Sequence, residues 1–447
     1  MRNKLKFLFL IILIISGCFN NTTPSNKITK IILKSSKSKI SANGKDFSLF
    51  TVEGKKANGK IVNLTDVAKY YDNNFIMSPS FNTLISGNHS IIAEYNNLKT
   101  NIIILKAEQK EDFFYKGADI SFLPELKDKN VVFKNALGKE EELLMILKNN
   151  GINTIRLRLW VDNEYCNLEK TLYMAKEIRK AGLNFLLDFH YSDTWADPRS
   201  QIKPNSWKDL DLAELKIKMY DYTLDIINQL KEQGTPPQLV QIGNEINNGI
   251  LNPEGNISKN GFEDFSNLLK SGIKAINDSF DKSDIKIIIH IAGYNSANWF
   301  FDNLVNNNID FDIIGLSYYP WWHGKSLDDL TNNLKKISEK YGKEIIIMET
   351  AYPWTFEWND WTNNIVGSED KLIDSYPGTV LGQKQFLVDL LNKVKTVPNN
   401  KGKGVFYWAP EWVAFKGDNS KDGSSWENLT LFDFENVVLN SIEAFNE

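Results

Sequence analysis

The sequence predicts an α/β protein, a (β/α)8 TIM barrel preceded by a small all-β module of the immunoglobulin type. From residue 113 onward, apolar runs rich in Ile, Val, Leu and Phe alternate with amphipathic stretches, and eight such repeats fill about 335 residues. Residues 27–105 differ, because they hold only short β-branched and aromatic runs with glycines at turn-like intervals. All twelve tryptophans lie from Trp160 onward, so the two parts also differ in composition.

The composition excludes several classes of function. The chain has 447 residues, enough for a large catalytic domain and a small module. Its net charge is −4 and its isoelectric point is about 5.8, so we expect no nucleic-acid partner. The two cysteines, Cys18 and Cys166, stand far apart, and the first lies in a targeting segment. We therefore expect neither a disulfide framework nor a cysteine-ligated zinc site.

Residues 1–18 resemble the signal peptide of a bacterial lipoprotein. Three basic residues precede the apolar run Phe7–Ile15, which is shorter than the roughly 20 residues of a membrane-spanning helix. Ser16 and Gly17 then lead into Cys18, which would become the lipidated first residue of the mature chain. A plain secretory signal is the alternative. We predict a secreted lipoprotein, anchored in a membrane at the cell surface, with residues 19–26 as a polar tether.

The all-β module is assigned to residues 27–107. Its predicted strands include Ile28–Leu33, Phe47–Val52, Ser90–Tyr95 and Asn101–Leu105. A passive spacer is preferred to a carbohydrate-binding role, because no aromatic platform is visible in this part of the sequence. The charged segment 107–112 marks the boundary, and the catalytic domain is assigned to residues 112–447.

The barrel repeats are recognised from near-continuous apolar runs, which are typical of strands buried on both faces. The predicted strands are Tyr115–Phe122, Thr154–Trp160, Asn184–Tyr191, Leu239–Glu245, Lys286–Ala292, Phe311–Tyr319, Glu344–Glu349 and Gly404–Trp408. The predicted helices are Lys139–Asn150, Leu168–Ala181, Asp211–Glu232, Phe262–Asn277, Ala297–Asn307, Leu327–Lys340, Gly382–Lys395 and Val437–Phe445. A doubly wound open sheet is the alternative, weakened by the lack of a glycine-rich nucleotide loop after the first strand.

Polar and aromatic side chains stand at the carboxyl ends of seven strands, where such barrels carry their chemistry. In chain order these residues include Arg158 and Trp160, Asp188 and His190, Asn244 and Glu245, His290, Tyr318 and Tyr319, Glu349, and Tyr407 and Trp408. One buried glutamate alone would be explained equally well by a structural ion pair. Two glutamates at equivalent strand ends, surrounded by His, Tyr, Asn and Trp, favour catalysis.

Glu245 and Glu349 fit the cleavage of a glycosidic bond. The glycosidic oxygen leaves only when protonated, so one carboxyl must hold a proton while a second attacks as an anion. Strands four and seven face each other, and we expect the carboxyls about 5 Å apart, as in retaining enzymes. We predict that Glu349 is the nucleophile and Glu245 the general acid/base, with mutual repulsion raising the pKa of one of them.

The candidate substrate-binding residues surround this pair: Arg158, Asp188, His190, Trp195, Asn244, His290, Tyr318 and Trp408. Asn244 is expected to bond the sugar hydroxyl next to the reacting carbon, and Trp408 to form the floor under the sugar. Tyr318 is expected to orient Glu349, and Arg158 to keep it ionised. For His290, a satisfied core histidine is the alternative.

Tryptophans also crowd the loops beyond the strand ends: Trp195, Trp207, Trp299, Trp321, Trp322, Trp354, Trp358 and Trp412. Because apolar sugar faces stack on such rings, their density predicts an extended polysaccharide cleft, although some of them will be core residues. Metal binding by the acid-rich segment around His190 is disfavoured, since its spacing matches no zinc pattern.

The barrel resembles glycoside hydrolase family 53, the endo-β-1,4-galactanases. The resemblance covers roughly Phe113 to Phe445 and is carried by Gly117–Ser121, Asp188–Pro198, Gly243–Glu245, Gly315–Pro320 and Met348–Thr350. It implies β-1,4-galactan as the substrate, the pectic side chain of type I arabinogalactan, cut internally with retention. It also implies Glu245 as acid/base, Glu349 as nucleophile, and supporting roles for Arg158, His190, Asn244, Tyr318 and Trp408.

The sequence departs from this family in the loops where some bacterial members bind calcium. After strand seven it reads Trp358 to Asn364 rather than alternating Asp and Gly. The last loop, Asp418 to Gly423, begins like a calcium loop but has Leu429 at the twelfth position in place of Glu. We expect no required cofactor. Calcium is retained as an alternative, with a Gly- and Asp-rich turn as the preferred interpretation.

Two other functions stay open at this point. A barrel glycosidase acting on mannan, xylan or glucan would carry the same pair of carboxyls. A non-catalytic lipoprotein that captures surface glycans would belong to a different class, and it would have no need of two buried acids together.

Overall fold

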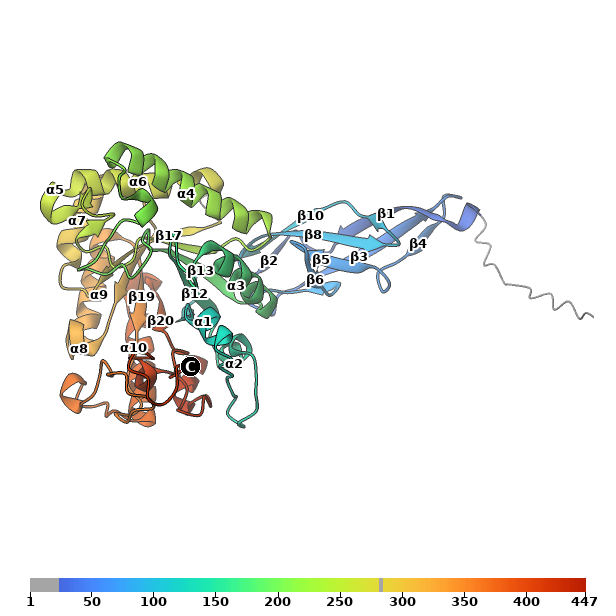
Figure 1. Ribbon diagram of the computed structural model, residues 1–447. Coiled ribbons are helices and arrows are strands. Elements are labelled where there is room, and N and C mark those ends of the chain that lie inside the picture. The colour runs from blue at the N-terminus through green and yellow to red at the C-terminus, as the bar shows by residue number, and fades with distance from the viewer. Residues whose placement is uncertain (1–23, 281–283) are drawn as a thin grey trace, which may run out of the picture.

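The computed structural model describes residues 24–280 and 284–447. Its larger part is built on a closed barrel of eight parallel strands, and the N-terminal strands extend from one side of it (Figure 1). Each barrel strand pairs with the next along the chain, and the last closes on the first. The barrel strands are β11 (Tyr115–Asp119), β12 (Thr154–Leu159), β13 (Asn184–Phe189), β14 (Leu239–Ile242), β17 (Lys286–Ala292), β18 (Ile313–Ser317), β19 (Glu344–Thr350) and β20 (Gly402–Trp408). The predicted (β/α)8 barrel is confirmed.

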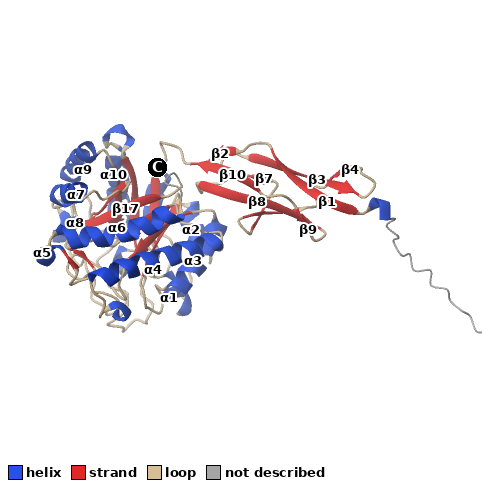
Figure 2. Cartoon of the chain, turned by 90° about the horizontal axis from the view of Figure 1, so that it is seen from above, coloured by secondary structure: helices blue, strands red, loops and turns tan. Residues whose placement is uncertain are grey.

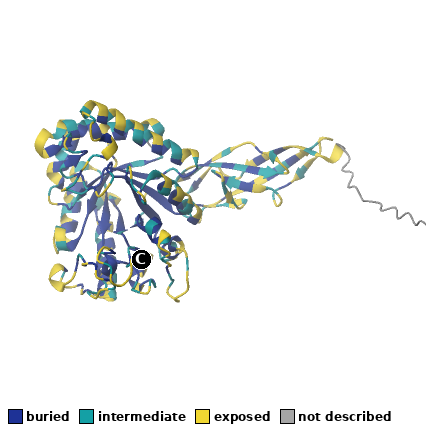
Figure 3. Ribbon diagram, in the orientation of Figure 1, coloured by how far each residue is buried: buried dark blue, intermediate teal, exposed yellow. Residues whose placement is uncertain are grey.

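Helices surround the barrel and bury one face each against it (Figures 1 and 3). Local signals fix their ends: Asp211 and Glu214 form a capping box at the start of α4, and Gly182 ends α3 in the left-handed conformation. The helices are α1 (Leu123–Asp128), α2 (Leu143–Asn149), α3 (Leu168–Ala181), α4 (Leu212–Glu232), α5 (Ile257–Asn260), α6 (Phe262–Ser279), α7 (Ala297–Asn306), α8 (Pro320–His323), α9 (Leu327–Tyr341) and α10 (Val380–Lys395).

One predicted helix is wrong. The segment Val437–Phe445 forms a 3-10 helix over Asn440–Asn446 instead of an α-helix. Its apolar residues do bury, because Ile442 and Phe445 join the main core beside α10. The apolar spacing of the segment predicts which residues are buried, but it does not decide between the α and the 3-10 hydrogen-bond pattern, which both occur in short pieces.

The barrel interior is layered, and the layering places the chemistry. Because strand side chains alternate between faces, every second residue points inward. Near the amino ends these inward residues are apolar, such as Leu186, Leu239 and Ile288. Two positions further along, the same strands carry Asp188, Gln241 and His290, all fully buried. The interior therefore changes from apolar to polar toward the carboxyl ends.

The N-terminal module is an all-β domain of two sheets (Figure 2). One sheet has the order β1-β3-β4 with β7 at β3, and the other has the order β2-β10-β8-β5-β6 with β9 at β8. A separate core that includes Phe50, Val52 and Ile91 lies between them. The strands are β1 (Ile28–Ser35), β2 (Lys39–Ser41), β3 (Ser48–Lys56), β4 (Ile61–Asn63), β5 (Lys69–Asp72), β6 (Phe75–Met77), β7 (Ser80–Phe81), β8 (Gly87–Tyr95), β9 (Leu98–Lys99) and β10 (Ile103–Glu108).

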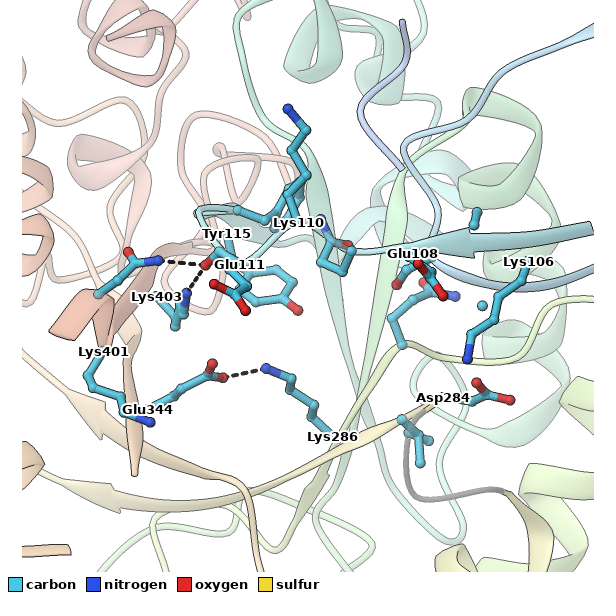
Figure 4. A pocket seen from close by; sticks show the side chains of 18 of the residues that line it. Lys106, Glu108, Lys110, Glu111, Tyr115, Asp284, Lys286, Glu344, Lys401 and Lys403 are labelled. Carbon is cyan, nitrogen blue, oxygen red and sulfur yellow. Dashed lines mark hydrogen bonds and ion pairs between the residues drawn. The ribbon is translucent and has the colours of Figure 1, made fainter. Parts of the chain in front are cut away.

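The module meets the barrel at the amino ends of the strands. Asp72 of the module accepts hydrogen bonds from His89 Nδ1 at 2.8 Å and from Arg179 on α3 of the barrel. Burial would raise the pKa of the Asp72 carboxyl, but His89 and Arg179 outweigh burial and lower it. A cavity at the same junction is lined by charged residues of both parts, among them Lys106, Glu108, Lys286, Glu344 and Lys403 (Figure 4).

The predicted signal peptide and Cys18 lie outside the described residues. Within the part of the chain that the structure describes, no helix has the length and apolarity that crossing a membrane requires.

Candidate active site

A cavity of about 640 Å³ opens at the carboxyl ends of the barrel strands. Glu245 enters it from the turn after β14, and Glu349 enters it from β19. Its walls also include Asp119, Arg158, His190, Trp195, Asn244, Tyr319, Trp322, His323, Trp408, Trp412 and Trp426. The two predicted catalytic carboxyls therefore share one cavity.

Arg156 is the centre of the charge network under this cavity. Its guanidinium donates to Glu349 Oε1 at 2.8 Å and to Asp119 Oδ2 at 3.1 Å through Nη1. Through Nη2 it donates to Asp188 Oδ2 at 2.7 Å and to Asn244 Oδ1 at 2.8 Å. Arg156 is 1% exposed, so its bonds to Glu349 and Asn244 fix these groups without solvent competition.

Glu349 reaches the cavity through an irregularity in the sheet. The register between β18 and β19 shifts so that Ser317 pairs with Glu349 rather than with Met348, whose side chain lies in the barrel core. Such bulges re-aim side chains beside active sites. Tyr319 then donates its hydroxyl hydrogen to Glu349 Oε2 at 3.1 Å. Burial raises the pKa of the Glu349 carboxyl, and the Arg156 charge opposes that rise.

Glu245 occupies a different electrostatic environment. It has φ +46, a conformation that non-glycine residues adopt rarely and that is found at strained functional positions. Its Oε1 accepts a hydrogen bond of 2.6 Å from the Ser317 hydroxyl, and no cation contacts it among the described residues. Burial, followed by repulsion from Glu349, raises the pKa of Glu245 to about 8. Glu245 is thus the protonated member of the pair near neutral pH, and Glu349, bonded to Arg156, is the anion.

His290 supports Glu245 from behind the cavity. Its Nε2 lies 2.9 Å from the Ser317 hydroxyl oxygen, which in turn donates to Glu245. Burial lowers the pKa of His290 well below its usual value, so the ring is neutral. On its other side, Nδ1 lies 2.9 Å from Asn244 Oδ1 and 3.1 Å from Gln241 Nε2, so the ring links Ser317 to Asn244. His290 therefore positions Ser317 and does not line the cavity.

Asp188 and His190 form a second supporting pair. His190 Nδ1 accepts from the indole of Trp160 at 3.0 Å, so its Nε2 carries the hydrogen and donates to Asp188 Oδ2 at 3.0 Å. Asp188 is fully buried and also holds Arg156. Of these two predicted substrate-binding residues, His190 lines the cavity and Asp188 lies behind it.

An aromatic wall flanks the other side of the cavity. The Arg158 guanidinium stacks over Phe122 at 4.2 Å and over Trp195 at 4.4 Å. Phe122 stacks on Trp412 with ring centroids 3.9 Å apart, and Trp408 contacts both. The predicted positions of Trp195 and Trp408 on the cavity wall are therefore found.

Two predicted contacts of Glu349 are corrected by the structure. Arg156, not Arg158, pairs with Glu349, because Arg158 lies one layer nearer the mouth of the barrel and is enclosed by aromatic rings. Tyr319, not Tyr318, bonds Glu349, because neighbouring residues point to opposite sides. The Tyr318 hydroxyl instead donates to the carbonyl of Gly324 at 2.8 Å.

The tryptophans predicted near the strand ends divide into three groups. Trp195, Trp322 and Trp412 line the cavity. Trp207 is a core residue at 1% exposure. Trp299 and Trp358, about half exposed, and Trp321 and Trp354, partly buried, do not line the cavity.

Arg156, Ser317 and Tyr319 bond the two glutamates, although the sequence alone assigned none of them a role in the site. The sequence could have indicated Arg156, because residues two apart in a strand point to the same face and Arg158 was already predicted to face the site. Ser317 and Tyr319 stand beside the predicted Tyr318, but the register shift that selects them is not visible in the sequence.

The loops considered for calcium lie side by side. Asp422 in the last loop is exposed, with its carboxylate bonded to Lys416 at 3.1 Å and to Ser420 at 3.0 Å. Asp360 of the loop after β19 lies against Gly423 of this last loop. Among the residues described, no group of three or more His, Cys, Asp or Glu side chains suited to a metal ion is found.

Comparisons with known proteins identify the family. The family model described as glycosyl hydrolase family 53 matches residues 115–445. An arabinogalactan endo-β-1,4-galactanase of Cellvibrio japonicus is 36% identical over 72% of this chain and 86% of its own length. An arabinogalactan endo-β-1,4-galactanase A of Emericella nidulans is also 36% identical, over 74% of this chain and 94% of its own length.

A solved structure agrees with these relatives. The family 53 catalytic domain of Ignisphaera aggregans superposes with a TM-score of 0.71 at 37% identity, over 75% of this chain and 96% of that one. Residues 115–445, which the family model matches, contain the barrel, the cavity, Glu245 and Glu349. The chain belongs to glycosyl hydrolase family 53.

Proposed function

We propose that this protein hydrolyses internal β-1,4-galactosidic bonds of type I arabinogalactan with retention of configuration. The observation that carries the proposal is that two carboxyls in one cavity have different hydrogen-bond partners and therefore suit different steps of the reaction. Glu349 is bonded to Arg156 and Tyr319, whereas Glu245 is bonded to a neutral hydroxyl and has its pKa raised to about 8. The substrate class follows the relatives that are named as endo-β-1,4-galactanases.

The reaction follows from this arrangement. Glu349 attacks the anomeric carbon, and Glu245 transfers its proton to the glycosidic oxygen, so that the leaving chain departs as a neutral alcohol. The resulting glycosyl ester on Glu349 is cleaved by water, which loses a proton to Glu245. Arg156 stabilises the Glu349 carboxylate before the attack and again after its release.

Product analysis tests the proposal. The soluble Phe19–Glu447 form is incubated with debranched β-1,4-galactan, with mannan, xylan and cellulose-type glucan as matched polymers. We expect short galacto-oligosaccharides from galactan alone. Cleavage of another polymer would keep the mechanism but contradict the galactan assignment. Binding without cleavage of any polymer would support the glycan-capture alternative.

We also propose a lipid anchor at Cys18, as the Ser16-Gly17-Cys18 pattern predicts. Cells that express the full chain with radiolabelled palmitate should incorporate label into the wild type and not into Cys18→Ser. Equal labelling of both would contradict the anchor. Protease shaving of intact cells would then test the proposed surface location.

For the N-terminal module we propose an immunoglobulin-like sandwich that acts as a spacer. Its two sheets enclose a separate core, in support of a sandwich. Its contacts with the barrel lie at the amino ends of the strands, in support of a role away from the substrate.

Calcium is proposed at the junction of the two loops after β19 and β20. Three buried oxygens there lack a hydrogen-bond partner: Asp360 Oδ2, Asn364 Oδ1 and Glu427 Oε2. Glu427 Oε1 accepts from Asn364 Nδ2 at 3.3 Å, and burial together with the nearby Asp360 raises the pKa of Glu427. Buried unpaired oxygens are costly, and carboxylate and amide oxygens are the ligands that calcium prefers.

Thermal unfolding with and without calcium tests this site. Calcium at 100 times its Kd stabilises a protein by about 2.7 kcal/mol, so we expect a rise in Tm on the order of 5 °C. Glu427→Gln should abolish the rise. Asp422→Asn, which removes an exposed carboxylate of the loop after β20, should keep it. A Tm that does not respond to calcium in the wild type would contradict the site.

A further inference from the structure

His323 lines the substrate cavity, and only one of its two ring nitrogens is bonded to the protein among the described residues. It ends α8, which follows β18 directly. Its Nδ1 accepts the backbone N–H of Tyr319 at 3.0 Å. Because that nitrogen is an acceptor, the neutral ring carries its hydrogen on Nε2. No partner for Nε2 is found among residues 24–280 and 284–447, and His323 lines the cavity.

The surroundings hold this ring in place. Gly293, just after β17, has φ +65, and a Cβ built there would lie 2.9 Å from His323 Cδ2 and 3.5 Å from Nε2. The ring therefore packs against Gly293, where a side chain would be disfavoured both by the positive φ and by the lack of space. Burial lowers the pKa of His323 to about 4, so the ring stays neutral, with one hydrogen to donate, through the neutral range.

The location of His323 indicates which part of the substrate it meets. Ser317, at the end of the same strand β18, donates to Glu245. Ala292, Trp322 and His323 form the stretch of cavity wall that follows β17 and β18. Arg158 on β12 lies across the barrel from this wall, because β12 and β18 are four strands apart in the closed sheet of eight. The leaving sugar stays attached to the oxygen that Glu245 protonates, and we place it against the wall beside Ser317, the residue that bonds Glu245.

We propose that His323 Nε2–H donates a hydrogen bond to a hydroxyl oxygen of the galactosyl unit on the leaving-group side of the bond that is cut. This proposal rests on the proposed function. It makes His323 a substrate-binding residue that selects for a sugar, rather than any alcohol, as the leaving group. A sugar hydroxyl that enters the cavity would accept this hydrogen, whereas a leaving group without hydroxyls could not.

The proposal competes with a purely structural role. Through its Nδ1, His323 holds the backbone of Tyr319, and the Tyr319 hydroxyl bonds Glu349. A positioning role would therefore act on the nucleophile and on every substrate alike. A role toward the leaving sugar would act only on substrates that have one.

Two variants and two substrates separate these roles. His323→Asn keeps an acceptor near the Nδ1 position but loses the Nε2–H donor, whereas His323→Gln places an amide donor near the Nε2 position. The substrates are β-1,4-galactotetraose and an aryl β-1,4-galactobioside, whose leaving group is not a sugar. We expect kcat/KM of His323→Asn to fall roughly 3- to 10-fold on the tetraose and to stay at the wild-type value on the aryl substrate.

On the tetraose, activity should follow the order wild type, Gln variant, Asn variant. Equal losses on both substrates, no loss on either, or an Asn variant as active as the Gln variant would overturn the proposal. The far-ultraviolet circular dichroism and Tm of both variants are compared with wild type to verify folding. If the wild type cleaves no galactan substrate, the proposed function fails, and this outcome is distinct from unaffected variants of an active enzyme.

Discussion

Glu349→Ala is expected to abolish galactan cleavage, with a loss of at least about 10⁴-fold in kcat, because no other group can form the glycosyl ester. The variant should fold. Arg156 keeps its ion pairs with Asp119 and Asp188, so the buried guanidinium stays compensated. Activity is measured on galactan and on an aryl galacto-oligosaccharide, and the Tm is measured in parallel.

Adding azide should restore cleavage of the aryl substrate by Glu349→Ala. In the space left by the missing carboxylate, azide can attack the anomeric carbon of the aryl substrate and displace the phenolate. The product should be the α-glycosyl azide, because a single displacement inverts the β bond. Glu344→Ala is the matched control, since Glu344 lies at the other end of β19 and pairs with Lys286. Substantial activity of Glu349→Ala without azide would contradict the assignment.

Glu245→Gln is expected to lower kcat/KM on galactan by about 10²- to 10⁴-fold, the usual contribution of a general acid. Bond cleavage in an aryl substrate with an acidic phenol should be affected much less, because that leaving group needs little protonation. The subsequent hydrolysis of the glycosyl ester should still slow, because water loses its general base. A burst of phenol followed by slow turnover is the measurement that verifies both effects. Equal loss of bond cleavage in the two substrates would contradict the acid role.

The pH profile of the wild type tests the same residue. Glu245 must be protonated to act as acid, and its raised pKa of about 8 keeps it protonated below that pH. The value of kcat/KM on galactan should therefore be maintained up to about pH 8 and fall above it. Ser317 donates to the Glu245 carboxylate and lowers its pKa, so Ser317→Ala should move the alkaline fall to higher pH. A fall that begins near pH 5 would contradict the assignment of this group.

The fold was predictable because its signals are local. The strand Lys286–Ala292 and the helix Leu168–Ala181 were predicted with the bounds that the structure gives them. Continuous apolar runs and terminating glycines carry this information without reference to the rest of the chain. The last predicted helix failed because its apolar spacing shows which residues are buried and not which hydrogen bonds form.

The site was predictable only in part. Its contacts depend on how deep in the barrel each side chain lies and on the register between neighbouring strands. Two arginines two residues apart on β12 point the same way, but only the deeper Arg156 reaches Glu349. The choice of Tyr319 over Tyr318 follows from a register shift between β18 and β19, which depends on both strands at once. His323 shows the same limit. The backbone N–H of Tyr319 bonds its Nδ1, and only this contact in the folded chain leaves Nε2 as the nitrogen without a protein partner.

The module and the cavity occupy opposite ends of the barrel. Residues of the module meet Tyr115, Lys286 and Glu344 at the amino ends of the strands, and the cavity opens beyond the carboxyl ends. An enzyme held by its first residues would therefore present its cavity away from whatever holds it. A polymer could then lie across the mouth with both of its ends free, so that the place of a cut need not depend on the distance to a chain end.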